Sequence, residues 1–553
     1  MKFFRRIFPL ASVLISLLIM PGPAAAQHQH GASGGASVCT ASGFGNVHHE
    51  VKAGNAEAQR MFDQGLALDY GFNHNQAEQC FRQAAGLDPN MAMAYWGIAL
   101  VLGPNYNLPV DSERESQARE AIKKALALSA NGPANERAYI EALAVRYTDQ
   151  PNADYHQLDV AYHDAMRELS KRYPDDLDAA TLFAESGMNL RPWKLWNRDG
   201  TPAEGTEEIL GVLESVLKRN PNHLGANHFY IHAVEASPHP EAGLQCAQRL
   251  AGLAPASGHL VHMPAHIFIR TGDHESSAKA NVAAARADEA YFKMVQPEGI
   301  YPMMYYTHNL HFIAVENAFM GNYEDSLAAA KRVQDHVAPH VKEEAMLDGF
   351  NPLPMHILVR FHRWREILTL AQPDAALPMS TGTWHFARAM AYANAGKLDE
   401  AKAELAALQN VAPEMAKIPT NPQGPHDAEV IPQIMGHLIE ARMASSQHER
   451  DTAIQYLREA VSLEDSLDYN EPPDWLYPTR EPLGGELLQA GKPAEAENVF
   501  REDLKKNARN PRSLFGLAES LKAQGKTSEA RAVQQQFNLA WKNADTKLEV
   551  PDL

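Results

Sequence analysis

The chain contains 553 residues, with 68 acidic and 50 Lys or Arg side chains, and its formal net charge is −18 at pH 7. An acidic chain repels phosphate backbones, which argues against nucleic-acid binding through the overall electrostatic field. Three cysteines, Cys39, Cys80 and Cys246, are too few for a disulfide-stapled fold, and no CxxC pair exists to bind metal through thiolates. The sequence leaves room for one disulfide, for example between Cys39 and Cys80, and does not decide it.

The N-terminal segment has the pattern of a bacterial signal peptide. Lys2, Arg5 and Arg6 precede an apolar run from residue 7 to residue 20, and small residues lead up to Ala26. The predicted signal peptide is 1–26, with cleavage after Ala26, so the mature protein is expected in the periplasm or outside the cell. No later segment has the roughly 18 apolar residues of a membrane helix, and we expect no membrane span after signal removal.

Residues 27–46 are rich in Gly, Ser, Ala and His and are expected to form a flexible leader. Beyond them, alanine-rich stretches of helical periodicity alternate with short turns, and no sustained strand pattern occurs. The first copy has the spacing of a tetratricopeptide repeat, a helical hairpin of about 34 residues, at Gly65, Ala77, Phe81, Ala84 and Pro89. Its small residues allow the two helices to approach closely, Phe81 fills the next layer and Pro89 ends the second helix.

A glycine turn followed by an acidic helix start recurs later in the chain, at Gly321, Gly396, Gly491 and Gly525. The pattern predicts an all-α fold, a tetratricopeptide-like solenoid of roughly eight to ten helix pairs that forms a curved superhelix. We divide the mature chain into N-terminal repeats (47–186), a central region (187–350), C-terminal repeats (351–545) and a tail (546–553). Such a fold says little about function by itself.

Two segments interrupt the repeat rhythm. Residues 187–206 and 293–307 are rich in Pro, Gly and aromatic side chains and are predicted to be loops or insertions. Each lies close in sequence to a histidine-bearing segment. They are candidates for the rim of a pocket, or for insertions with a purely structural role.

Histidines are concentrated in one part of the chain, since 10 of the 25 lie between residues 223 and 311. Most fall on three short segments, at the three- or four-residue spacing that places side chains on one face of a helix. With a neighbouring glutamate, the candidate metal ligands are His228, His232, Glu235, His259, His262, His266, His308 and His311. Pro264 fits the first turn of a helix, which would leave His259 in the preceding loop.

The three segments also share a position within the repeat. Two follow helix-ending prolines, Pro221 and Pro255, and the third precedes the turn at Gly321, so each is predicted to form the first helix of a hairpin. The first helices of a solenoid line its concave surface together. We therefore expect the histidines to converge on one concave site.

The donor set limits the metal. Imidazole and carboxylate ligands without thiolate favour a divalent transition metal: zinc, copper, nickel or iron. Eight donors exceed the needs of one tetrahedral ion and leave room for two. Met263, Met303 and Met304 lie close in sequence and would favour copper(I) as ligands, or else fill the core.

Three functional interpretations follow from this pattern. The leading one is an exported repeat protein with a histidine-based metal site on its concave face, whose role is metal binding or metal-dependent chemistry. In the second, the protein is a periplasmic scaffold that binds a protein or peptide partner in its groove, and the histidines pack and cap helices. The third is a metal-dependent hydrolase or oxidase with Glu235 as a base, although HExxH and phosphate-loop motifs are absent.

Several sequence blocks resemble those of a known group of proteins. HFYIHAVEAS, GHLVHMPAHIFIR and YPMMYYTHNLH, together with MAMAYWGIALVLGPNYN and SLFGLAESLKAQGK, are similar to a group of large exported bacterial tetratricopeptide-repeat proteins. The resemblance spans nearly the whole mature chain. It implies the repeat fold and export, and it supplies no catalytic residues.

Overall fold

The computed structural model describes residues 38–553, apart from 110, 151–152, 298, 300 and 419–426. The predicted signal peptide and most of the predicted leader lie outside the described residues. The predicted all-α class is confirmed, because the described residues form helices and turns with two isolated β-bridges. Among them, no helix is both long enough and apolar enough to cross a membrane.

Consecutive helices pair into hairpins in the first half of the chain. The pairs are α1 (Ala56–Asp69) with α2 (His74–Leu87), α3 (Ala92–Leu102) with α4 (Ser112–Ser129), α5 (Ala134–Ala144) with α6 (Tyr155–Arg172), α7 (Leu177–Asn189) with α8 (Thr206–Arg219), and α9 (Leu224–Glu235) with α10 (Leu244–Leu253). The next hairpin has an interrupted first helix, α11 (Gly258–His262) and α12 (Pro264–Thr271), which packs against α13 (His274–Val295).

The same arrangement continues to the C-terminus. The pairs are α14 (Thr307–Phe319) with α15 (Tyr323–Val337), α16 (Leu353–Arg360) with α17 (Trp364–Ile367), α18 (Pro378–Asn394) with α19 (Leu398–Met415), α20 (Asp427–Ser446) with α21 (Arg450–Glu464), α22 (Arg480–Gln489) with α23 (Pro493–Lys506), and α24 (Pro511–Ala523) with α25 (Thr527–Ala540). The described residues thus hold twelve pairs. Two of these pairs include a short or interrupted helix, which has little helical periodicity in its sequence. The sequence therefore predicts roughly eight to ten pairs.

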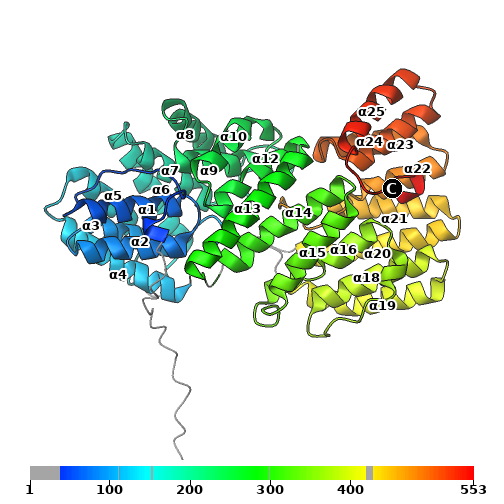
Figure 1. The fold of residues 1–553 in the computed structure, drawn as a ribbon, viewed down its shortest axis with the longest axis horizontal. Helices are drawn as coiled ribbons and strands as arrows, with labels where there is room; N and C mark the ends of the chain where they lie inside the picture. The colour runs from blue at the N-terminus through cyan, green and yellow to red at the C-terminus, as the bar shows by residue number, and fades with distance from the viewer. Residues whose placement is uncertain (1–37, 110, 151–152, 298, 300, 419–426) are drawn as a thin grey trace, which may run out of the picture. The chain divides into compact units, whose positions relative to one another are not determined.

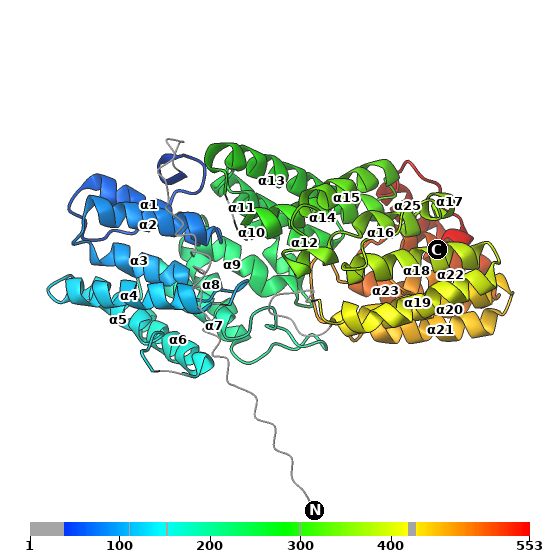
Figure 2. The same ribbon diagram turned by 90° about the horizontal axis from the view of Figure 1, so that it is seen from below.

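Each hairpin packs on the next one along the chain, as in a solenoid. The second helix of one pair contacts the first of the following pair, for example α2 with α3, α13 with α14 and α23 with α24. Figure 1 and Figure 2 show this succession from α1 to α25 in two views. Most buried apolar side chains fall into two large clusters, one chiefly from α1–α12 and the other chiefly from α14–α25. The histidine-bearing helices lie where these clusters succeed each other.

Glycine–phenylalanine contacts set the spacing of the first repeats. A Cβ at Gly65 would lie 2.7 Å from Phe81 Cε1, and one at Gly97 would lie 2.5 Å from Phe81 Cδ1. The Phe81 ring is fully buried between α1, α2 and α3. The close approach predicted for Gly65 is confirmed, and the ring serves two helix contacts at once.

The glycine turns are also confirmed. Gly321, Gly396, Gly491 and Gly525 have φ between 69° and 78°, the left-handed region that favours glycine after a helix C-terminus. The two irregular segments differ from each other. Residues 190–205 form a loop between α7 and α8, whereas 301–306 form a π-helical turn, η3 (Tyr301–Tyr306), that leads directly into α14.

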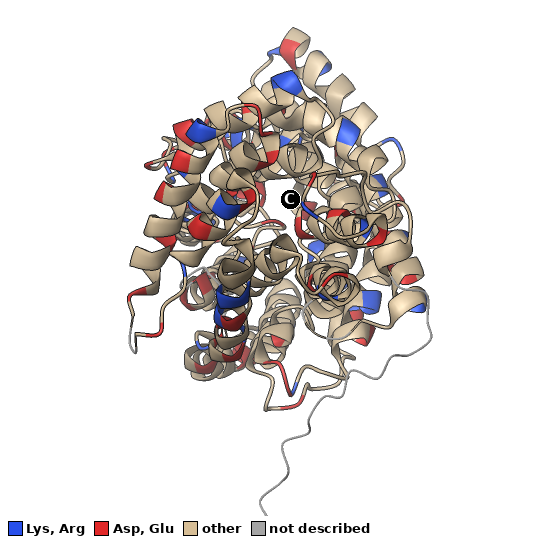
Figure 3. Cartoon of the chain, turned by 90° about the vertical axis from the view of Figure 1, so that its left-hand side faces the viewer, with Lys and Arg blue, Asp and Glu red and all other residues tan. Residues whose placement is uncertain are grey.

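Cys39 and Cys80 form a disulfide that ties the first described residues to α2, with a Cα–Cα distance of 5.3 Å. This is the pairing that the sequence left undecided. Cys246 is a buried free thiol. Acidic and basic residues are interspersed along the helices in Figure 3. Many of them form ion pairs, such as Arg198–Asp468 and Lys542–Glu275.

Candidate metal centre

Helix α9 places two histidines and a glutamate in the protein interior. It starts after Pro221, where the His223 ring accepts a hydrogen bond from Ala226 N at 3.2 Å. Every residue of α9 is buried, including His228 (0% exposed), His232 (2%) and Glu235 (1%). Polar groups this deeply buried normally form hydrogen bonds or bind an ion, so the contacts of each one help to identify its role.

The second histidine segment is interrupted by Pro264. The proline takes the first position of α12, and His259 lies in the separate short helix α11 rather than in the loop that was the alternative. The interruption still leaves His259, His262 and His266 buried and close to α9. The third segment, with His308 and His311, begins α14. All three segments are therefore first helices of hairpins, as predicted from the repeat phase.

His228, His232 and His259 form a first trio of imidazoles. One nitrogen from each ring lies within 4.8 Å of the other two, and His228 Nε2 is 3.1 Å from His259 Nε2. The Phe72 ring packs against all three rings, with centroids 4.5–5.6 Å away. His228 Nδ1 donates to the Tyr70 carbonyl at 2.6 Å, which leaves Nε2 as the ring's lone-pair nitrogen.

His262, His266 and His308 form a second trio with the same mutual spacing. His262 Nε2 and His266 Nε2 are 2.7 Å apart. His262 Nδ1 donates to Asn281 Oδ1 at 2.6 Å, and the Asn281 amide is oriented by its own donation to the Ser277 carbonyl. Because His262 Nδ1 carries the hydrogen, the lone pair of this ring is on Nε2, which faces His266.

Glu235 lies between the two trios. Its Oε1 accepts a hydrogen bond from His232 Nδ1 at 2.9 Å, and its Oε2 lies 2.6 Å from His266 Nδ1. Glu471 Oε2 lies 3.1 Å from the same His266 nitrogen. Both carboxylates therefore face the outer side of the rings. Glu235 thus has an orienting contact with a ring of each trio, and its carboxylate also lies within 4.8 Å of ligand atoms of His266 and Glu471, a spacing that would allow it to be a ligand itself, as expected from the sequence.

The arrangement of donors matches that of histidines that hold metal. Metal-binding histidines usually donate the N–H of their second ring nitrogen to a carboxylate or carbonyl. Here His228 Nδ1 donates to a backbone carbonyl, and His232 Nδ1 donates to a carboxylate. Two nitrogens bound to one ion at about 2.0–2.1 Å and at ordinary angles are about 2.9–3.3 Å apart. The 3.1 Å between His228 and His259 fits that range, and the 2.7 Å between His262 and His266 lies just below it.

Some nitrogens in the first trio lack any other partner. His232 Nε2 and His259 Nδ1 are buried and form no hydrogen bond with the residues that the structure describes. A buried unsatisfied nitrogen costs about 1–3 kcal/mol, so each one calls for an explanation. A metal ion in the first trio would occupy the His232 nitrogen.

Burial keeps most of these imidazoles neutral. It lowers the pKa of His228, His259, His262 and His308 well below the usual range, and the neighbouring rings reinforce the shift. At His266 burial also lowers the pKa, but the Glu235 and Glu471 carboxylates outweigh it and raise the pKa to about 10. Neutral rings are the form that binds metal, and they are present in both trios at pH 7.

His311 does not join either trio. Its Nδ1 is buried without a hydrogen-bond partner in the described part of the chain, and its ring packs on Phe350 with a centroid distance of 5.7 Å. Burial lowers the pKa of His311 to about 3. The i, i+3 spacing places His308 and His311 on one helix face, but of the two only His308 belongs to a described group of possible ligands within 4.8 Å of one another.

Three partners of the centre were missed by the sequence. Tyr70 and Asn281 contribute through a carbonyl and an amide, for which no local motif exists. Glu471 comes from the irregular segment between α21 and α22, more than 200 residues from His266. The only available signal was the polar, proline-rich composition of that segment.

Another group of His and Asp side chains has a structural role. His49 Nδ1 lies 2.8 Å from Asp178 Oδ2, and the Tyr70 hydroxyl donates to Asp178 Oδ1 at 2.6 Å. The Tyr139 hydroxyl donates to Asp176 Oδ2 at 2.8 Å. These oxygens are already engaged, so the group fastens α7 to the first repeats and holds Tyr70 in place beside His228.

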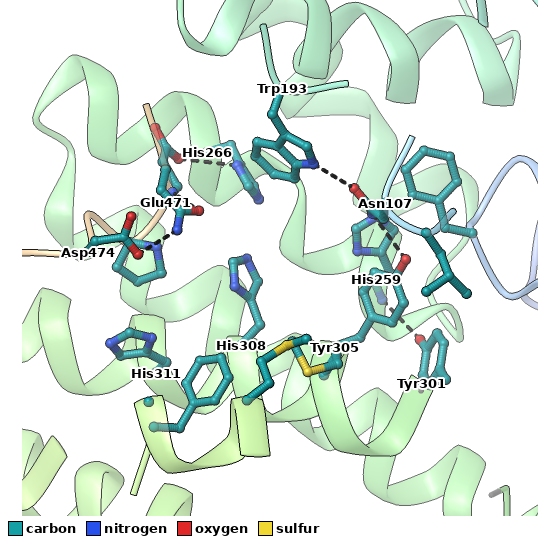
Figure 4. A pocket seen from close by; sticks show the side chains of 18 of the residues that line it. Asn107, Trp193, His259, His266, Tyr301, Tyr305, His308, His311, Glu471 and Asp474 are labelled. Carbon is teal, nitrogen blue, oxygen red and sulfur yellow. Dashed lines mark hydrogen bonds and ion pairs between the residues drawn. The ribbon is translucent and has the colours of Figure 1, made fainter. Parts of the chain in front are cut away.

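A cavity of about 210 Å³ adjoins the centre. His232, His259, His266 and His308 contribute to its wall, and Figure 4 shows the last three around the open space together with Glu471 and Tyr305. The loop after α7 contributes Trp193, and η3 contributes Tyr305, so both irregular segments help to line the cavity. Met304 also lines the cavity, whereas Met263 is fully buried in the core.

The chain resembles known proteins only distantly. No protein-family model matches the chain, and no curated protein matches it. Among solved structures, it is similar to a human IFIT1 dimer with PPP-AAAA (12% identity, 87% of this chain and 90% of that one, TM-score 0.32). It is also similar to the APC/C hetero-tetramer Cut9-Hcn1 (11%, 90% and 75%, TM-score 0.29) and to the P58(IPK) TPR domain (12%, 86% and 100%, TM-score 0.23). TM-scores this low transfer no function, and the tetratricopeptide-like character of this chain rests on its own stacked hairpins.

Proposed function

We propose that the protein binds two divalent transition-metal ions, one at His228, His232 and His259 and the other at His262, His266 and His308. The observation that carries the proposal is the convergence of six imidazoles in two trios. Outer acceptors fix the Nδ1 atoms of several of these rings. Packing histidines would instead be expected to satisfy both ring nitrogens with ordinary acceptors and donors.

Zinc and copper fit the donor set best. Three imidazoles in each trio would leave an open coordination position, as in catalytic rather than structural sites. No thiolate is present, since Cys246 lies on α10 outside the trios and the other two cysteines form the disulfide. The Glu235 and Glu471 carboxylates offset part of the ion charge from the outer side of His266.

Metal stoichiometry of the purified full-length protein tests the proposal. After stripping and reconstitution with Zn²⁺ or Cu²⁺, elemental analysis should give two ions per chain. His232→Ala and His262→Ala should each retain one, and the double variant none. His274→Ala is the matched control, because His274 forms a buried pair with Glu316 at 2.6 Å on α13 and α14 outside both trios. A protein that retains no first-row metal contradicts the proposal.

The second candidate function is that of a scaffold for a protein or peptide partner, which the stacked helical hairpins favour. The two functions differ in their response to chelation. A partner bound in a repeat groove should remain bound in EDTA and bind the His232→Ala/His262→Ala variant equally well. Loss of the complex under either condition would instead tie the partner to the metal.

We further propose that the protein acts after export, in the periplasm or outside the cell. The Cys39–Cys80 disulfide supports this, because such bonds persist in oxidising compartments. Intact-mass analysis of protein from the periplasmic fraction should give a chain that begins at Gln27. A chain that keeps residues 1–26 and stays in the cytoplasm would contradict it.

A further inference from the structure

The cavity beside the centre is lined by two unlike kinds of side chain. His232, His259, His266 and His308 are the members of the trios that reach the open space. Apolar side chains of α16, α18 and α20 also line it, among them Leu353, Met379 and Met435. A molecule in this space could therefore contact both the histidines and the apolar side chains.

Two further histidines line the cavity without belonging to a trio. His311 lies on α14 and His356 on α16, and the Nδ1 atom of each is buried with no hydrogen-bond partner in the described part of the chain. The His356 ring is held between aromatic neighbours, with centroids 6.1 Å from Trp475 and 5.8 Å from Tyr477. Figure 4 shows His311 at the edge of the space beside His308. Both rings therefore offer a nitrogen that a ligand could engage.

We infer that this cavity binds a small molecule with a single hydroxyl-bearing aromatic ring, a phenol or catechol, whose oxygen coordinates a metal ion of the centre. The inference rests on the proposed metal binding. A neutral imidazole nitrogen can donate to or accept from a hydroxyl, so His311 and His356 are assigned to hold the ring substituents. They are recognition residues for this ligand rather than metal ligands.

Size and composition support an aromatic ring. An apolar cavity of about 150 Å³ holds benzene, so about 210 Å³ accommodates one substituted ring. Methionine side chains adapt their shape and make favourable sulfur–aromatic contacts, and Met304, Met346, Met379 and Met435 all line the space. Phe350 also lines the space and adds an aromatic ring.

The test uses 4-nitrocatechol, whose visible absorption changes when it coordinates a metal. It is titrated into the Cu²⁺-loaded full-length protein, and 4-nitroveratrole, the same ring with both hydroxyls methylated, serves as the control ligand. We expect saturable spectral change with 4-nitrocatechol only. His311→Ala and His356→Ala should each weaken binding about tenfold with metal content unchanged, and Met435→Trp, which fills the cavity, should abolish it. His385→Ala is the matched control, because His385 pairs with Glu404 at 2.6 Å outside the cavity.

The outcomes separate this inference from the proposed function. If the protein holds two ions but 4-nitrocatechol causes no saturable change, or the His311 and His356 variants bind it as well as the unaltered chain, the inference is wrong and metal binding stands. If no metal binds, the proposed function fails. A thermal shift of the metal-free protein by 4-nitrocatechol, lost in the His311→Ala/His356→Ala variant, would then still support the pocket, and the lack of a shift would overturn it.

Discussion

Glu235 is shared by His232 and His266, with Oε1 2.9 Å from His232 Nδ1 and Oε2 2.6 Å from His266 Nδ1. One carboxylate thus orients a ring of each trio. Glu235 follows His232 by three residues on α9, so local helix geometry places the two side chains on the same face. Burial would raise the pKa of Glu235, but His266 and His232 outweigh burial and lower it to about 2.

Glu235→Gln should weaken both metal sites together. The amide keeps the shape but loses the charge that stabilises the rings and the ions, and loss of such an outer partner typically costs 10–100-fold in metal affinity. Competition titration with a chromophoric chelator measures the change. Glu316→Gln, which alters the equivalent buried pair with His274, should leave both affinities unchanged. A change at only one site would show that the carboxylate does not couple the trios.

Removal of the metal should lower thermal stability without unfolding the chain. The histidines sit on helices already packed into the two apolar clusters, so the helices do not depend on the ions. An ion present at about 1,000 times its dissociation constant stabilises the folded state by about 4 kcal/mol. We expect EDTA to lower Tm by several degrees in calorimetry, with the far-ultraviolet circular dichroism at 25 °C unaltered. Loss of helix on chelation would contradict a preformed site.

Gly65→Ala should destabilise the first repeats. The new methyl group would lie 2.7 Å from Phe81 Cε1, and the Phe81 ring is also confined by Gly97. Overpacking of this kind costs about 1–3 kcal/mol, which denaturant unfolding can measure. Gly86→Ala is the matched control, because it lies in α2 with nothing within 4 Å and should instead stabilise by about 0.5–1 kcal/mol. Equal changes in unfolding free energy at both positions would contradict the tight contact between Gly65 and Phe81.

Asp288 should make the protein less stable as the pH rises. It is fully buried, and burial raises its pKa from 3.8 to about 7, although Tyr301 and Asn309 donate to it at 3.0 and 2.7 Å. Because the folded-state pKa lies above the unfolded one, its contribution is fully present below pH 3.8 and is lost as the pH rises through about 7. The difference corresponds to at most about 4 kcal/mol.

Asp288→Asn should remove this dependence, since the neutral amide has no proton to lose and Asn309 can turn its own amide to match. Denaturant unfolding between pH 5 and pH 8 measures the slope in both proteins. Asp335→Asn, on an exposed position of α15, should leave the slope as it is. A variant at residue 288 with the original slope would assign the pH dependence to other groups.

Helical periodicity and turn glycines were sufficient to predict the fold class. Gly65, Phe81 and the glycine turns have local consequences, namely a close helix contact and a left-handed residue, that do not depend on distant parts of the chain. The same holds for the placement of His228, His232 and Glu235 on one face of α9. The repeat phase added that three such helices line one region, which the contacts between their rings confirm.

The sequence by itself determined which helices carry histidines and which face those side chains occupy, because both follow from spacing along one helix. Only the tertiary structure decided how the rings divide into two trios, that Glu235 faces their outer side, and that Glu471 joins them from the segment before α22. It also set His311 apart, beside a cavity that it shares with His356. These relationships depend on the angles between successive hairpins, which many small packing contacts fix together and no local pattern encodes.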